Sequence, residues 1–142
     1  MESGFLHWGH DISPEENQYQ AGLNFAISYK KNINFVGKEA LLKIKDQNPT
    51  KSLAMIVLKD NRPGEPLLLH EEPIYLDDKI IGRTTSGNYS FNFKKNISFG
   101  YVNSGNSTED LINKNLSIEV EKKKYPVTII KKPLNQKNIK NI

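Results

Sequence analysis

The sequence of 142 residues contains no cysteine. This absence excludes a disulfide framework, thiol catalysis and cysteine-ligated metal sites. A reducing compartment favours such a composition, and we therefore expect a cytoplasmic protein. Long apolar runs are also missing. The longest, Leu53 to Leu58, is far too short to cross a bilayer, so we expect no membrane segment.

Arginine is scarce, and the positive charge is unevenly placed along the chain. The formal net charge is +4, yet residues 1–130 contain equal numbers of basic and acidic side chains. The whole excess comes from four lysines near the C-terminus: Lys131, Lys132, Lys137 and Lys140. A neutral body with a basic tail lacks the broad positive face that phosphate-backbone binding requires, so we expect no nucleic-acid partner.

Short apolar runs separated by turn residues fill the chain after Ser52. Turn chemistry occurs at Asn61 to Gly64, Asp77-Asp78, Gly87-Asn88 and Ser104 to Asn106. The expected strands cover residues 53–58, 73–76, 79–85, 97–102, 116–120 and 125–130. Six short strands at this spacing predict a mainly β fold, a small antiparallel Greek-key β-barrel, although a sheet sandwich would give a similar pattern.

A short α/β leader precedes the expected barrel. Ser13 followed by Pro14 and Glu16 is a helix-start signature and predicts a short helical turn. Residues 23–27 alternate between apolar and polar side chains, as a half-buried strand requires. A helix is expected over residues 38–45, after Gly37 and before Asn48-Pro49. We therefore divide the chain into the α/β part at 1–48, the β-barrel at 49–134 and a frayed tail at 135–142.

One segment, His7 to Asp11, contains two histidines and a carboxylate and could be read as a metal or acid-base cluster. Gly9 lies between the histidines and disfavours a helix, so the metal signal is weak and we assign no metal site. The simpler interpretation is that Trp8 anchors the segment in a core. His10 and Asp11 would then satisfy nearby backbone groups.

The sequence shows no nucleophile–base arrangement, so we assign no catalytic residue. Three pairs of adjacent carboxylates would point to opposite faces of a strand, and we expect them to be solvated. These pairs are Glu15-Glu16, Glu71-Glu72 and Asp77-Asp78.

Residues 82–87 are bounded by glycines and rich in hydroxyl groups, which suggests phosphate binding. The segment lacks the Lys-Ser/Thr ending and following helix of a phosphate loop, so a tight turn between strands is the stronger prediction. Just beyond it, Tyr89, Phe91 and Phe93 are two residues apart and would share one strand face. They would either fill the barrel interior or form a platform on which bases stack.

Four sequence blocks resemble one family. Residues 82–102, GRTTSGNYSFNFKKNISFGYV, resemble the C-terminal barrel of the folate-dependent aminomethyltransferases. That family includes the glycine cleavage T-protein and the rear half of dimethylglycine and sarcosine dehydrogenases. The match extends, in the family's order, over HWGHDI at 7–12 with QAGLNFAI at 20–27, NFVGKEALLKIK at 34–45 and KYPVTIIKKPL at 124–134. HWGHDI and the closing strand are more similar to the dimethylglycine and sarcosine dehydrogenase branch.

The resemblance implies a function. Family members bind tetrahydrofolate in a channel formed by three domains and transfer a one-carbon unit to it from an amine. Residues 1–48 would be the tail end of a folate-binding α/β domain, with His7, Trp8 and Tyr19 along the wall of the folate channel. FAD would lie only in a separate upstream domain. The expected partners are the missing N-terminal domains of the same enzyme and a small-molecule amine.

The chain also departs from the family pattern. The catalytic Asp belongs to an N-terminal portion that has no counterpart here, so the resemblance implies an enzyme whose isolated fragment is inactive. The family's Arg-hydrophobic-Glu sequence would place its Arg one residue before Met1, which suggests a C-terminal piece. Many members carry an Arg near the C-terminus that reaches the folate glutamate. Lys137 is the only nearby cation here.

The alternative is a small β-barrel binding module for nucleic acid or a partner protein. Tyr89, Phe91 and Phe93 would be its platform. Buried rings would favour the enzyme family, and three exposed rings beside Lys94 and Lys95 would favour the binding module.

Overall fold

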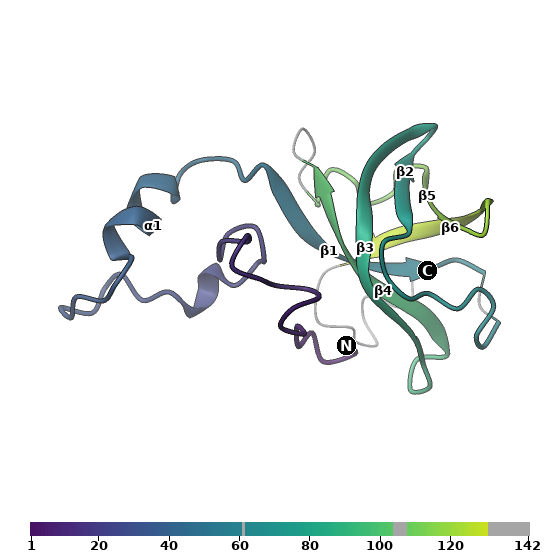
Figure 1. The fold of residues 1–142 in the computed structure, drawn as a ribbon, viewed down its shortest axis with the longest axis horizontal. Coiled ribbons are helices and arrows are strands. Elements are labelled where there is room, and N and C mark those ends of the chain that lie inside the picture. Colours follow the sequence, from purple (N-terminus) through teal and green to yellow (C-terminus); the bar gives the residue numbers. More distant parts are fainter. Residues whose placement is uncertain (61, 104–107, 131–142) are drawn as a thin grey trace.

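The computed structural model describes residues 1–60, 62–103 and 108–130. Two short helices, η1 (Asn24–Ala26) and α1 (Lys38–Ile44), precede the strands. The strands are β1 (Lys51–Leu58), β2 (Pro73–Leu76), β3 (Lys79–Ser90), β4 (Lys95–Asn103), β5 (Leu116–Val120) and β6 (Lys123–Ile130). They close into an antiparallel barrel in the order β1-β4-β3-β2-β5-β6 (Figure 1). Because β5 returns beside β2, after the consecutive strands β2, β3 and β4, the topology is a Greek key, and the predicted fold class is confirmed.

The strand positions agree with the sequence prediction except on β3. Strands β2 and β5 have the predicted bounds, and the predicted cores of β1, β4 and β6 lie inside longer strands. Strand β3, however, continues to Ser90, so the turn expected at Gly87-Asn88 is wrong. The expected turn at Ser104 to Asn106 and the expected frayed tail at 135–142 lie outside the described residues.

Strand β1 is buried on both of its faces, which explains its continuous apolar run. Residues on all six strands form an interior cluster, including Ala54, Ile56 and Leu58 of β1. The alternate residues Leu53, Met55 and Val57 belong to an outer cluster. That cluster also contains Ile97, Phe99, Tyr101 and Ile130, and Met1, Leu6 and Phe93 pack against it. Residues near the N-terminus therefore cover the outer face of β1 and β4.

The leader, residues 1–50, is held to the barrel by polar side chains. Glu2 accepts hydrogen bonds from the Ser90 hydroxyl and from the Asn92 amide, the latter at 2.6 Å, and these bonds lower the pKa of Glu2. The later part of the leader projects away from the barrel, with α1 at its far end (Figure 1). Each residue of α1 is at least partly exposed. None of the helices within the described residues is long and apolar enough to span a bilayer.

Two local predictions for the leader are wrong. Residues 24–26 form the 3₁₀ helix η1 instead of a strand, with the Ile27 amide donating to the Asn24 carbonyl. A lone alternating segment has no neighbour to complete a sheet, and an isolated strand is unstable in water. After Ser13 the capping hydrogen bonds form, but the chain continues as turns. The Gln20 carbonyl there accepts a hydrogen bond from Leu53 of β1. The helix predicted after Gly37 is confirmed as α1.

Candidate functional site

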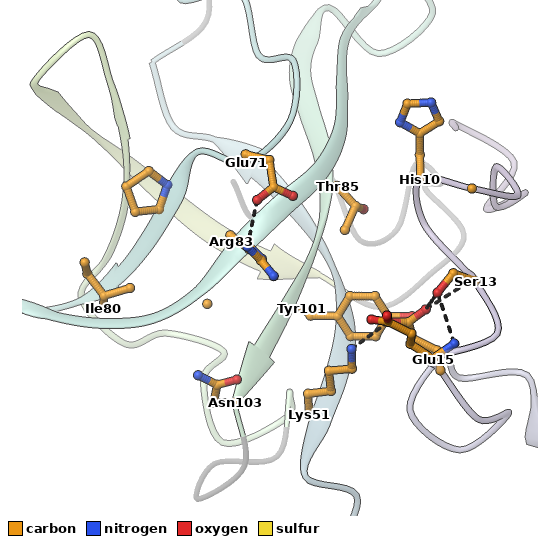
Figure 2. A pocket seen from close by; sticks show the side chains of 14 residues that line it. His10, Ser13, Glu15, Lys51, Glu71, Ile80, Arg83, Thr85, Tyr101 and Asn103 are labelled. Atoms are coloured by element: carbon orange, nitrogen blue, oxygen red, sulfur yellow. Dashed lines mark hydrogen bonds and ion pairs between the residues drawn. The ribbon is translucent and has the colours of Figure 1, made fainter.

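A pocket of about 570 Å³ lies between residues 9–16 of the leader and the barrel wall (Figure 2). The wall is formed by the first residue of β1 and by parts of β2, β3 and β4. Charged and polar side chains dominate the lining, including His10, Glu16, Lys51, Glu71, Arg83 and Tyr101. This is a surface built by two segments far apart in the sequence.

Glu16 and Lys51 form an ion pair at the leader side of the pocket, with 2.6 Å between Oε1 and Nζ. The Glu16 side chain is only 10% exposed, so the expectation that this carboxylate is solvated is wrong. Burial opposes its ionisation, but hydrogen bonds from Lys51 and Ser13 outweigh burial and hold the pKa below the ordinary 4.5. Lys51 Nζ also lies 4.8 Å from the ring centroid of Tyr101, within the range of a cation–π contact.

On the barrel side, Arg83 donates to Glu71 at 2.8 Å, and both side chains are largely exposed. The neighbouring Glu72 behaves differently. It is half-buried and accepts hydrogen bonds from the Thr84 hydroxyl and from the Leu69 amide, the latter at 2.8 Å. The expectation of a solvated carboxylate therefore holds for Glu71 and is wrong for Glu72. Asp77 and Asp78 are exposed as expected.

Asp11 is the most buried acidic side chain in the described part of the leader, with 2% of the residue exposed. Its Oδ2 accepts the His7 amide at 2.8 Å, which confirms the predicted bond to a nearby backbone group. Its Oδ1 accepts the hydroxyls of Thr85 at 2.6 Å and Ser86 at 2.7 Å, two contacts that the sequence did not predict. The Tyr101 hydroxyl donates to the Asp11 carbonyl at 2.9 Å, and burial raises the pKa of that tyrosine.

The three residues predicted for a folate-channel wall are spread over the leader. His7 is exposed and stacks on His10, with 4.6 Å between ring centroids. Trp8 is 66% exposed, so its predicted role as a core anchor is wrong, because Met1 and Leu6 make that contact instead. The Tyr19 hydroxyl lies 2.6 Å from the Tyr29 hydroxyl; partial desolvation and this hydrogen bond raise the pKa of Tyr19 to about 12.

The described lining of the pocket includes His10 but none of the side chains of His7, Trp8 and Tyr19. Their role at a cofactor remains a prediction. Within the described residues, no three His, Asp or Glu side chains are arranged to hold a metal ion.

The aromatic residues after Gly87 do not form one surface. Strand β3 ends at Ser90, so Tyr89, Phe91 and Phe93 do not share a strand face, contrary to the prediction. Phe91 is 80% exposed and meets Tyr89 edge-on at 5.1 Å, whereas Phe93 packs against the outer cluster. These rings neither fill the barrel interior nor form the exposed platform of three rings that the binding-module alternative requires.

The glycine-bounded segment 82–87 is a stretch of β3, and the prediction of a tight turn is wrong. Its glycines are explained by close approach of other backbone. A Cβ at Gly82 would overlap the carbonyl oxygen of Tyr101, and one at Gly87 would collide with Leu68. Glycine inside a strand marks such approaches or a bulge. A bulge does lie between them, at Thr84 to Ser86.

Residues 51–135 match the family model described as the glycine cleavage T-protein C-terminal barrel domain. The chain belongs to this family. It is 33% identical to mitochondrial dimethylglycine dehydrogenase of Mus musculus over 135 residues, which are 94% of this chain and 15% of that protein. It is 32% identical to an aminomethyltransferase of Listeria welshimeri over 133 residues, covering 94% of this chain and 35% of that protein.

A solved structure supports the same fold. The glycine cleavage system aminomethyltransferase T from Bartonella henselae superposes with a TM-score of 0.79 and 20% identity. The superposition covers 96% of this chain and 37% of that one. The chain thus spans between about a seventh and about a third of the relatives it matches, and its similarity to them includes the leader as well as the barrel.

Proposed function

We propose that this chain is the C-terminal part of a tetrahydrofolate-dependent enzyme that transfers a one-carbon unit from an amine. The enzyme would be of the dimethylglycine or sarcosine dehydrogenase type, or of the glycine cleavage T-protein type. The observation that carries the proposal is the similarity to dimethylglycine dehydrogenase and to aminomethyltransferases over 94% of the chain.

The chain supplies part of a folate site in this proposal. When bound, tetrahydrofolate provides the nitrogen that accepts the one-carbon unit. The exposed rings of Trp8 and His7 offer flat surfaces on which a pterin ring can stack, and this is what supports them as wall residues. Tyr19, paired with Tyr29, is the third proposed wall residue.

The reacting carboxylate is proposed to come from another domain. Asp11 is the one acidic residue close to the proposed wall that is fully buried in the described structure, but its two oxygens already accept three hydrogen bonds. It is therefore poorly placed to meet a substrate amine. FAD does not fit the described residues either, because the only candidate phosphate loop, residues 82–87, is part of a strand. FAD is proposed only for an upstream domain.

The proposed partner is the set of N-terminal domains of the same enzyme. The leader exposes large apolar side chains that need a covering surface: Phe5, Phe25, Ile33, Val36 and Leu42. A cavity of about 530 Å³, lined in part by Ile27, Ile33 and Leu41, opens among them. We propose that residues 1–48 complete the folate-binding domain, with 49–134 as the barrel domain and the cytoplasm as the compartment.

The test compares the 142-residue chain with a protein extended upstream by the domains of its relatives. Calorimetric titration with tetrahydrofolate and turnover assays with sarcosine and dimethylglycine should give binding and activity for the extended protein only. Positioning supplies much of the rate in such transfers, so a single wall is not enough. Tight folate binding by the short chain would contradict the proposal, as would an extended protein that binds no folate.

A matched pair of variants tests the wall residues in the extended protein. Trp8→Ala should weaken folate binding by about tenfold or more, since stacking on an aromatic ring is worth about 1–3 kcal/mol. Phe91→Ala removes a similarly exposed ring far along the chain and should leave binding unchanged. Equal affinities for the two variants would remove Trp8 from the site.

A further inference from the structure

We propose that Asp11 is a positioning residue that locks the His7–His10 loop onto β3 and so holds Trp8 and His7 in place beside the pocket. The importance of this loop for folate rests on the proposed function. The locking itself follows from the contacts of Asp11 with the barrel. Gly9 and His10 line the pocket directly, so the position of the loop also determines the shape of the pocket.

On the barrel side, the attachment of Asp11 depends on the bulge in β3. Thr84 pairs with Gly100 and Ser86 pairs with Phe99, so Thr85 is the extra residue. In a regular strand, successive side chains point to opposite faces, and Thr85 and Ser86 could not reach one acceptor. A bulge places two residues opposite one and redirects their side chains. Here both hydroxyls reach Oδ1 of Asp11, at 2.6 and 2.7 Å. Figure 2 shows Thr85 on β3, facing the leader segment that carries His10.

On the leader side, the same carboxylate closes a tight loop. Oδ2 of Asp11 accepts the His7 amide at 2.8 Å, and the Asp11 amide donates back to the His7 carbonyl at 2.8 Å. Gly9 lies between them with φ +89°, in the left-handed region that glycine occupies without strain. The loop is therefore a preformed unit, and its orientation depends on where Asp11 is attached.

Burial makes this attachment strong. A buried carboxylate is stable only when hydrogen bonds replace its hydration, and bonds to an ionised acceptor are roughly twice as strong as neutral ones. Asp11 is 2% exposed and accepts three hydrogen bonds on its carboxylate, and its carbonyl accepts the Tyr101 hydroxyl. The side chains of His7, Trp8 and His10 are, in contrast, exposed. The loop therefore exposes three rings while buried Asp11 attaches it to the barrel. Binding residues are often found on loops that a rigid scaffold positions in this way.

The experiment measures loop motion by ¹⁵N relaxation in the 142-residue chain. In the wild type, backbone order parameters for residues 7–10 should be near the rigid value of about 0.85, and in Asp11→Ala they should fall to about 0.6 or below. Asp78→Ala, at a fully exposed carboxylate on the β2–β3 hairpin, is the matched control and should change nothing here. Unchanged order parameters in a folded Asp11→Ala protein would overturn the proposal.

A second set of variants decides the question from the barrel side, even if Asp11→Ala does not fold. The double variant Thr85→Val with Ser86→Ala removes both hydroxyl donors and leaves the leader sequence intact, so the loop should become mobile. The single variant Thr85→Ser keeps both hydroxyl donors, and its loop should stay as rigid as in the wild type. If the double variant and Thr85→Ser show equally rigid loops, Asp11 does not act through the bulge and the proposal fails.

The link to folate is measured separately in the extended protein. Asp11→Ala should raise the Kd for tetrahydrofolate by about tenfold, because a displaced wall residue loses its alignment with the ligand. If the wild-type extended protein binds no folate, the proposed function fails, and the relaxation result still decides the locking role. If it binds folate and Asp11→Ala binds equally well, the positioning role fails.

Discussion

The barrel and the leader differ in the interactions that hold them in place. The barrel is closed by hydrogen-bonded strand pairs all the way round, and β1 is buried on both faces by the interior and outer clusters. The leader is attached by buried or half-buried polar side chains, chiefly Asp11 and Glu16, and leaves Phe25, Ile33 and Val36 exposed. The barrel buries its interior cluster by itself, and Met1 and Leu6 of the leader help to cover its outer cluster. The leader leaves many of its large apolar side chains exposed, and these are the side chains that the proposed N-terminal domains would cover.

Helix α1 illustrates the difference. It has seven residues and is at least partly exposed throughout. Isolated helices shorter than about 12–15 residues are marginal in water, so α1 must gain most of its stability from packing. Little of that packing comes from the barrel, from which α1 lies apart (Figure 1).

The strongest test of this difference between barrel and leader introduces the same charged residue into each region. Val57→Asp puts a carboxylate into a fully buried position of β1 and should cost more than about 4 kcal/mol, enough to prevent folding. Val36→Asp changes a fully exposed leader residue and should shift the free energy of unfolding by about 0.5 kcal/mol or less. Circular dichroism shows whether Val57→Asp folds, and urea denaturation measures the free energy of unfolding of any variant that does. Similar losses would show that the leader is part of the same cooperative core.

A second pair compares aromatic rings. Phe99→Ala removes a fully buried ring of the outer cluster and should cost about 3–5 kcal/mol, through lost burial and the cavity left behind. Phe91→Ala removes a ring that is 80% exposed and should cost about 0.5 kcal/mol or less. Thermal melts of the two variants provide the measurement. A small effect of Phe99→Ala would mean that the outer cluster contributes little.

The glycines of β3 offer a smaller, local test. Gly82→Ala should cost about 1–3 kcal/mol, because the new methyl group overlaps the Tyr101 carbonyl and the strands must separate. Asn88→Ala, at an exposed position of the same strand, is the control and should be close to neutral. A neutral Gly82→Ala in chemical denaturation would contradict the close approach of β3 and β4.

The smallest expected effect concerns the polar attachment of the leader and depends on pH. The pKa of Glu16 is lowered in the folded protein, so its contribution is present above the ordinary value of 4.5 and is lost as pH falls through the lower folded value. Glu16→Gln should cost about 1–2 kcal/mol at pH 7, as expected for a charged hydrogen bond. It should also flatten the loss of stability in acid.

Glu15→Gln is the control for this last prediction, since Glu15 is the exposed neighbour of Glu16. Stability curves of both variants from pH 7 to pH 3 give the measurement. Parallel curves for the wild type and Glu16→Gln would show that the ion pair with Lys51 does not anchor the leader.

The sequence alone located most of the strands and identified the family, while the closure of the strands into a barrel came from the structure. Alternating apolar residues and turn signals located the strands, as for Leu116 to Val120, because side-chain periodicity reports directly on which face is buried. The blocks around Gly82 to Val102 led to the family that the barrel match confirms. These features depend on residues that are close together in the chain, so they can be recognised in the sequence itself.

The contacts that build the pocket were decided only by the tertiary structure. Asp11 meets Thr85 and Ser86 across more than 70 positions of sequence, and nothing near any of the three residues signals that meeting. A glycine such as Gly82 can occupy either a turn or a close approach of two strands, and the sequence does not distinguish these roles. The position of the Tyr101 carbonyl shows that Gly82 has the second role. Periodicity shows that a face is buried but not what buries it. The exposure of Trp8 and the pairing of Glu16 with Lys51 therefore depended on the fold.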